Sequence, residues 1–316
     1  TSNFSCRVYA PVGGYNDLLP YLVRRLLENG ANTSFIHQLN KKNSEAFDIV
    51  TCLEVLEHVP DPKELVKTCI NLLKSIVETF SNDVWIVAPE FEKSGASHAL
   101  SFTSDLKLKE QGEKIFSVNG TPGDCVAIAL DRVLKDKRPD VLLSGVNSGC
   151  NIGEDTTYSG TIAGAMEGIM RKVPSISISQ NYESGKKDQI KWDATNHFFP
   201  EIFEKLSRIG WQEDTFININ FPHCEPSNVK GIEITTQGNR DSDDLIIYEK
   251  DRNIFRFGLR RRAEEHGNKL GVTQNKRVPG FMTDVEAIAN HYISITPMHI
   301  DLTHENSLIR LKEGLN

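Results

Sequence analysis

The chain has 316 residues, 39% hydrophobic and 25% charged, with a formal net charge of −7. This composition is typical of a globular protein with a large core, and the acidic balance argues against nonspecific nucleic-acid binding. No apolar run approaches the roughly 20 residues that a membrane span needs, and the six scattered cysteines form no CxxC pair. We therefore expect a cytoplasmic protein without membrane or nucleic-acid partners.

Residues 1–40 contain a loop and one predicted helix. Leucines recur at helical spacing after position 17, and Gly30 ends the helix. The stretch RVYAPVGGYNDLLPYLVRRLLENGANTSF resembles the last helix of the proline dehydrogenase domain of bifunctional proline-utilisation enzymes. The resemblance implies that Arg24 and Arg25 correspond to arginines that bind the substrate carboxylate. The flavin-binding barrel is absent, so we expect these arginines to lie on a solvated helix face.

Residues 41–76 predict a strand, a loop and a helix. The strand is Asp48 to Thr51, and Pro60 and Pro62 precede an amphipathic helix. The stretch FDIVTCLEVLEHVPDPKELVKTCINLLKSI resembles class I methyltransferases, most closely the ubiquinone-pathway O-methyltransferases. No glycine-rich loop or ribose-binding acid precedes it, so S-adenosylmethionine binding is not expected.

Residues 77–316 read as one α/β domain. Apolar strands are predicted at 81–90, 140–145 and 175–179, with helices at 124–135 and 162–170 between them and shorter strands after 215. This alternation predicts a Rossmann-like, doubly wound, mainly parallel sheet with C-terminal β-hairpin extensions. In such a sheet the site lies at the carboxyl ends of the strands.

The most informative stretch is SGVNSGCNIGEDTTYSGTIAGAMEGI, from Ser144 to Ile169. It joins a strand end, a glycine-rich loop with hydroxyl and amide side chains, and a helix start. Backbone N–H groups at a helix N-terminus favour a phosphate or another small anion. The alternative is a tight turn in which Ser or Thr simply caps the helix.

Residues from about 77 to 316 resemble the SurE family of 5′-nucleotidases. The resemblance rests on VAPEFEKSGASHALS, VNGTPGDCVAIAL, PDVLLSGVNSGCNIGEDTTYSGTIAGAMEG, VPSISIS, FRFGLRRRAEE, TDVEAI and YISITPMHIDLT, in that order. It implies a cytoplasmic, metal-dependent phosphatase acting on nucleoside 5′-monophosphates. It also implies a homodimer or homotetramer with an exchanged C-terminal hairpin or arm.

Family roles carry over by position. Ser94 matches a serine metal ligand and Asn147 an asparagine ligand, and oxygen donors of this kind suit magnesium or manganese. Ser159, Gly160 and Thr161 match the site that holds the substrate phosphate, where hydroxyl and backbone donors offset the charge of phosphoryl transfer.

The family signature TNDDG, whose two aspartates bind the metal, is absent. The only adjacent aspartates, Asp243 and Asp244, lie far downstream in a polar stretch. Without these charges we expect weak or lost metal binding, and the catalytic residues stay unknown. We expect DIVTC to take the place of the family's first strand, docked at an edge or as a replacement. Four polar residues then approach the strand's carboxyl end: Glu54, Glu57, His58 and Asp61. They are either replacement ligands or, by default, solvated loop charges.

Two other features have open interpretations. His98 is either a proton donor or a surface polar residue, and Arg260 to Arg262 either clamp phosphate, face a partner subunit or form a solvated run.

Two functions remain: a phosphomonoesterase acting on nucleoside 5′-monophosphates, or a non-catalytic mosaic remnant that keeps an anion-binding pocket.

Overall fold

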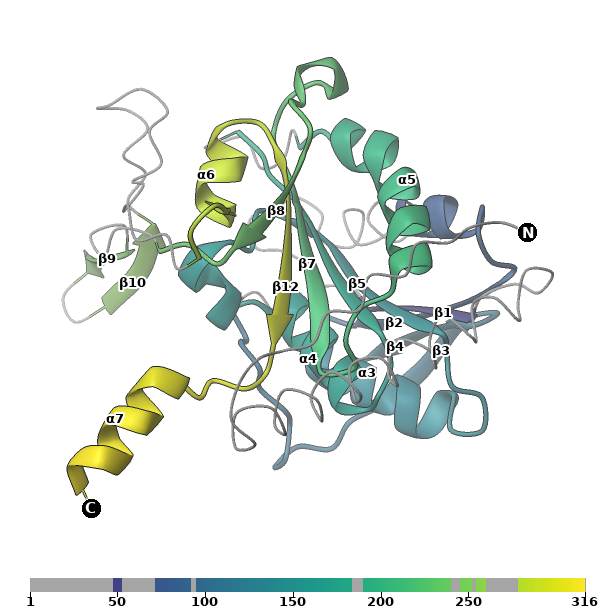
Figure 1. Cartoon of the computed structure of the whole chain (residues 1–316). Coiled ribbons are helices and arrows are strands. Elements are labelled where there is room, and N and C mark those ends of the chain that lie inside the picture. The colour runs from purple at the N-terminus through teal and green to yellow at the C-terminus, as the bar shows by residue number, and fades with distance from the viewer. Residues whose placement is uncertain are drawn as a thin grey trace, which may run out of the picture.

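A computed structural model of the chain describes residues 48–52, 72–91, 95–183, 190–239, 245–251, 254–259 and 278–315. Most strands form one ten-stranded sheet of order β11-β8-β12-β7-β6-β5-β1-β2-β4-β3 (Figure 1). Its parallel centre consists of β4 (Ile115–Val118), β2 (Asp83–Pro89), β1 (Asp48–Cys52), β5 (Val141–Ser148), β6 (Ser175–Gln180) and β7 (Thr215–Phe221). The predicted mainly parallel α/β architecture is confirmed.

The two ends of the sheet are mixed. At one end β3 (Leu108–Gly112) pairs antiparallel with β4; at the other, β12 (Ile293–His299) pairs antiparallel with β7. Outside β12, β8 (Ile232–Thr236) and β11 (Met282–Thr283) add parallel pairs. A separate antiparallel hairpin joins β9 (Leu245–Asp251) to β10 (Ile254–Leu259), as the predicted hairpin extensions require.

Helices cover both faces of the sheet, among them a short helix over 72–77, and one further helix, α7 (Glu305–Leu315), lies apart from it (Figure 1). The other helices are α3 (Pro122–Ile128), α4 (Gly160–Met170), α5 (Asp193–Ile209) and α6 (Asp284–Ala289), with short turns at Ala129–Val133, Gly153–Thr157 and Pro226–Asn228. On one face, Phe199 and Phe203 of α5 pack with Leu143 and Ile178 of the sheet. On the other, α3 packs with Val87 and Leu142. This two-sided burial explains the continuous apolar runs of the central strands.

DIVTC lies inside the sheet, between β2 and β5. Ile49 is in register with Val84 on one side and with Val141 on the other, both in parallel pairs. A parallel pair needs a crossover connection, and the described part of the connection from β1 to β2 is helical over 72–77. Leu73, Ile76 and Val77 of this helix are buried on the α5 face. The expectation that DIVTC joins the main sheet is therefore confirmed, and its position is central rather than at an edge. That it replaces the family's first strand stays a prediction.

Among the residues that the structure describes, none of the helices combines the length and the apolar character that crossing a membrane requires.

Candidate functional site

The carboxyl end of β5 is irregular, and the irregularity decides which way its side chains face. Pairing with β6 shifts register between Ser144 and Asn147. Gly145 lies in this bulge with φ of +134°, and an added Cβ would collide with the carbonyl oxygen of Ile178. Only glycine combines that backbone angle with so close an approach.

The bulge reverses the alternation of the strand. Leu143 packs on the α5 face, and Val146, three residues later, packs in the same cluster. In a regular strand residues three apart face opposite sides. Ser144 faces α4, because a Cβ on Gly164 would stand 2.6 Å from its Oγ. Side chains alternate regularly again after Val146, so Asn147 lies on the α4 face.

Asn147 carries a buried acceptor without a partner. The residue is 6% exposed, and its Nδ2 donates to the carbonyl oxygen of Gly149 at 2.8 Å. Its Oδ1 finds no hydrogen-bond partner among the described residues. An unsatisfied buried acceptor costs about 1–3 kcal/mol, so such a position favours a ligand that approaches the oxygen.

Helix α4 approaches β5 closely and runs antiparallel to it. Gly164 lies beside Ser144. Gly168, one turn later, lies against Ser175, and a Cβ added to Gly168 would stand 3.4 Å from Cδ1 of Leu142. Side chains at either glycine would push the helix off the sheet. Because the strand index falls as the helix index rises, the N-terminus of α4 is directed toward the carboxyl end of β5. Gly160 and Asn147 therefore lie at the same edge of the sheet.

Ser159 caps α4. Its backbone is extended (φ −83°, ψ 125°), and its Oγ accepts a hydrogen bond from the N–H of Ile162 at 3.2 Å. Ser159 is 7% exposed and Thr161 is fully buried. The capping interpretation of YSGT is thus confirmed. It does not exclude phosphate binding, because a capped helix N-terminus still presents its positive end.

The other candidate residues from the sequence lie outside the described residues. They are Ser94, Arg24, Arg25, Glu54, Glu57, His58, Asp61, Asp243, Asp244 and Arg260 to Arg262. The assignment of Ser94 and Asn147 to one metal site therefore stays a prediction. Within the described part of the chain, no three His, Cys, Asp or Glu side chains gather as a metal site would require.

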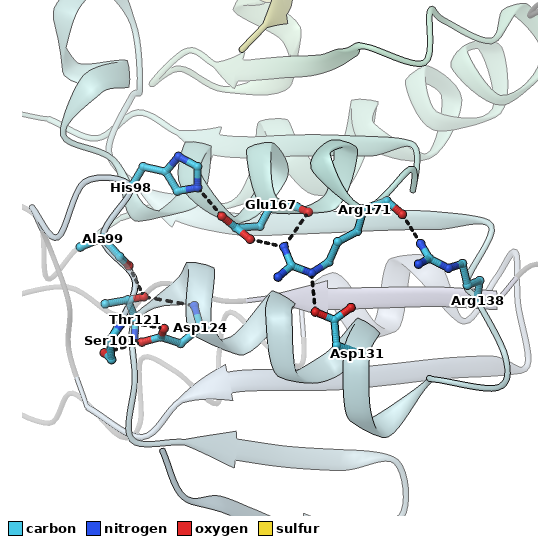
Figure 2. A network of polar contacts seen from close by, with 9 residues as sticks. All are labelled: His98, Ala99, Ser101, Thr121, Asp124, Asp131, Arg138, Glu167 and Arg171. Atoms are coloured by element: carbon cyan, nitrogen blue, oxygen red, sulfur yellow. Dashed lines mark hydrogen bonds and ion pairs between the residues drawn. The ribbon is translucent and has the colours of Figure 1, made fainter. Parts of the chain in front are cut away.

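His98 joins a network that the sequence analysis missed (Figure 2). Its Nε2 lies 2.5 Å from Oε1 of Glu167, a carboxylate whose side chain is 2% exposed. The other oxygen of Glu167 binds Arg171, whose Nε donates to Asp131 at 2.9 Å. His98 is therefore tied to α4 and is no isolated surface residue. The sequence did contain a signal for this network. Glu167 is the one charged residue in a helix of otherwise small or apolar side chains, and it stands four residues before Arg171, the spacing of an ion pair on one helix face.

Glu167 is held in its charged form. Burial by itself raises its pKa, but the hydrogen bond with His98 and the charge of Arg171 outweigh burial, so the pKa is lowered. Removing either partner would leave a buried carboxylate incompletely paired, which is costly.

A second buried carboxylate fixes the same loop to α3. Asp124 accepts from the N–H and Oγ of Ser101 at 2.9 and 2.7 Å and completes a capping box with Thr121. The loop 95–101 is thus anchored to α4 by His98 and to α3 by Ser101 (Figure 2).

Buried amides hold the loop that follows β5. The N–H of Asn151 donates to Asn220 at 2.8 Å, and its Nδ2 donates to Ser179 at 2.8 Å. Two residues later, the N–H of Gly153 donates to the buried Asp284 at 3.0 Å. The segment between β5 and α4 therefore has a fixed shape before any ligand arrives.

Comparison with known proteins adds three findings. A family model described as survival protein SurE matches residues 66–244, and one described as proline dehydrogenase matches residues 1–38. Proteins named 5′-nucleotidase SurE from Methylorubrum extorquens (strain PA1) and Parvibaculum lavamentivorans are 42% and 41% identical to the chain. The alignments cover 76% and 78% of this chain and 91% and 86% of those proteins. The crystal structure of the SurE protein from Aquifex aeolicus superposes with a TM-score of 0.67 at 30% identity, over 85% of this chain and 100% of that one.

Proposed function

Because the chain belongs to the SurE family, whose curated members are named 5′-nucleotidases, we propose that its site binds nucleoside 5′-monophosphates as phosphomonoester substrates. The phosphate is assigned to Ser159, Gly160 and Thr161 at the start of α4. This phosphate assignment rests on the family match and on the N-terminus of α4, whose backbone N–H groups favour an anion. The observation that carries the proposed site is Asn147, whose buried Oδ1 lacks a partner among the described residues and suits a cation beside that phosphate.

Asn147 fits a divalent cation as one neutral oxygen ligand, and Ser94 is assigned as a second. Magnesium or manganese suits such donors. A cation held there would polarise the phosphate ester. Ligand charge largely sets affinity for hard cations, and both assigned ligands are neutral. We therefore propose that this chain binds the metal weakly.

We expect this chain to hydrolyse these esters negligibly. Family members carry TNDDG after their first strand, whereas β1 is followed in this sequence by LEVLEHVPDP. The specific observation favouring a second function is that β1 lies in the centre of the sheet, while no adjacent aspartates follow it in the sequence before β2. That second function is an anion-binding protein of SurE architecture without turnover.

A dimer or tetramer is proposed on the same family ground. Helix α7 extends away from the sheet beyond β12 (Figure 1), and its Leu308, Ile309 and Leu311 are each more than half exposed. Sedimentation of the full chain measures the oligomeric state directly.

Two variants that remove comparable helix caps test the phosphate site. Ser159→Ala removes the cap of α4 and Thr283→Ala removes the cap of α6, each at about 1 kcal/mol of stability. We expect calorimetric titration with inorganic phosphate to show binding to the wild-type chain and to Thr283→Ala, but at least about 5-fold weaker binding to Ser159→Ala. Equal affinities for all three proteins would contradict the assignment. Parallel assays of manganese-dependent AMP hydrolysis decide between the two functions.

A further inference from the structure

Tyr158 stands directly before the helix cap and is 58% exposed. Ser159, the next residue, is 7% exposed. Consecutive Cα atoms are about 3.8 Å apart. An exposed aromatic ring thus branches from the backbone one residue away from the assigned phosphate position.

The backbone of Tyr158 is held from both sides. Its N–H donates to the carbonyl oxygen of Asp155 at 3.1 Å, and its carbonyl oxygen accepts from the N–H of Ser97 at 3.0 Å. The Oγ of Ser97 also donates to the carbonyl oxygen of Thr157 at 2.6 Å. The segment carrying the ring is therefore bonded to the loop 95–101 at two consecutive residues.

That loop is itself immobilised on two helices. Figure 2 shows His98 reaching Glu167 on α4, and Ser101 reaching Asp124 on α3. Between these anchors, the carbonyl oxygen of Ala99 accepts a hydrogen bond from Oγ1 of Thr121 at 2.7 Å. An aromatic ring on so well fixed a backbone loses little conformational entropy when a ligand stacks on it.

We propose that Tyr158 is the stacking platform for the base or sugar face of the nucleoside, and so the residue that distinguishes nucleotides from simple phosphate esters. The proposal rests on the proposed function, which supplies the phosphate at Ser159. In a nucleoside 5′-monophosphate only the ribose separates the phosphate from the base, so a phosphate at the cap leaves the base within reach of the preceding residue. Aromatic side chains stack on any base, because every base has a π-face.

Titration of the full chain with AMP and with ribose 5-phosphate tests the proposal. We expect the wild-type chain to bind AMP more tightly than ribose 5-phosphate. Tyr158→Ala weakens AMP binding by about 5- to 100-fold and changes ribose 5-phosphate binding by less than about 2-fold. Tyr158→Trp restores the AMP affinity. Binding is the readout because it does not depend on turnover.

Phe102 supplies the matched control. It is an exposed aromatic residue (89%) next to Ser101, on the segment that adjoins the same loop. Phe102→Ala leaves both affinities unchanged. Three outcomes overturn the proposal while leaving the phosphate site intact. Tyr158→Ala lowers the affinity for AMP and for ribose 5-phosphate equally, Phe102→Ala lowers the AMP affinity as much as Tyr158→Ala does, or the wild-type chain shows no preference for AMP. Failure of the wild-type chain to bind either ligand removes the proposed function, and the Tyr158 platform with it.

Discussion

The two sides of the sheet edge at β5 differ in how they match the site expected for this family. On the α4 side, the glycine bulge, the buried Asn147 and the capped helix start all come from one short segment, residues 144–161. On the β1 side, the strand pairs in register with both neighbours, yet the segment after it lacks adjacent aspartates. Sheet pairing uses backbone groups and tolerates a foreign sequence, whereas a metal site depends on particular side chains.

The most drastic way to break this contrast is to restore the β1 side. Replacing residues 1–76 with a family-type MRILVTNDDG strand and helix should raise manganese-dependent AMP hydrolysis by at least about 10²–10³-fold, the effect that one electrostatic group has in such sites. The same replacement with TNDDG changed to TNAAG is the control and should stay inactive. Robust hydrolysis by the unmodified chain would contradict the expectation and point to Glu54 or Glu57 as substitute ligands.

The α4 side can be broken at Gly145. Gly145→Ala combines a positive φ with a collision against the Ile178 backbone, so we expect a loss of about 3 kcal/mol or more in the free energy of unfolding and loss of phosphate binding. Gly280→Ala is the control, because Gly280 also has a positive φ (+90°) but open space around it. The free energy of unfolding of Gly280→Ala should fall by only about 1 kcal/mol. Urea unfolding measures both, and equal losses would show that the approach to Ile178 is unimportant.

The smallest effect concerns the buried carboxylate behind the loop. Glu167→Gln should cost about 2 kcal/mol of unfolding free energy at neutral pH, the worth of hydrogen bonds to a charged group. The folded-state pKa of Glu167 is lowered from 4.5, so its contribution is present above 4.5 and is lost as pH falls through the lower folded value. The difference between wild type and variant should therefore shrink in acid.

Glu201→Gln is the surface control for that experiment. Glu201 also pairs with a cation, Lys205, but both side chains are more than half exposed. Its replacement should not measurably change unfolding at any pH. If the difference between wild type and Glu167→Gln instead grew as the pH fell, the charged state assigned to Glu167 would be wrong.

The sequence by itself determined the α/β class, the order of strands, loops and helices along the chain, and the family. Long apolar runs and glycine-rich loops report directly on buried parallel strands and helix starts. It also indicated DIVTC as a sheet strand, because a strand, a loop and a helix form a complete crossover unit. The proline dehydrogenase resemblance of the first segment was equally readable, and a family model matches it.

Only the tertiary structure decided which face each polar residue occupies. Strict alternation would have placed Asn147 with Leu143 on the α5 face, and the bulge at Gly145 reverses this. No residue near His98 in the sequence indicated its contact with Glu167, which lies 69 positions away. Local patterns fix backbone conformation over a few residues, whereas the direction of a side chain at a strand end and its distant partner depend on how strands and helices pack.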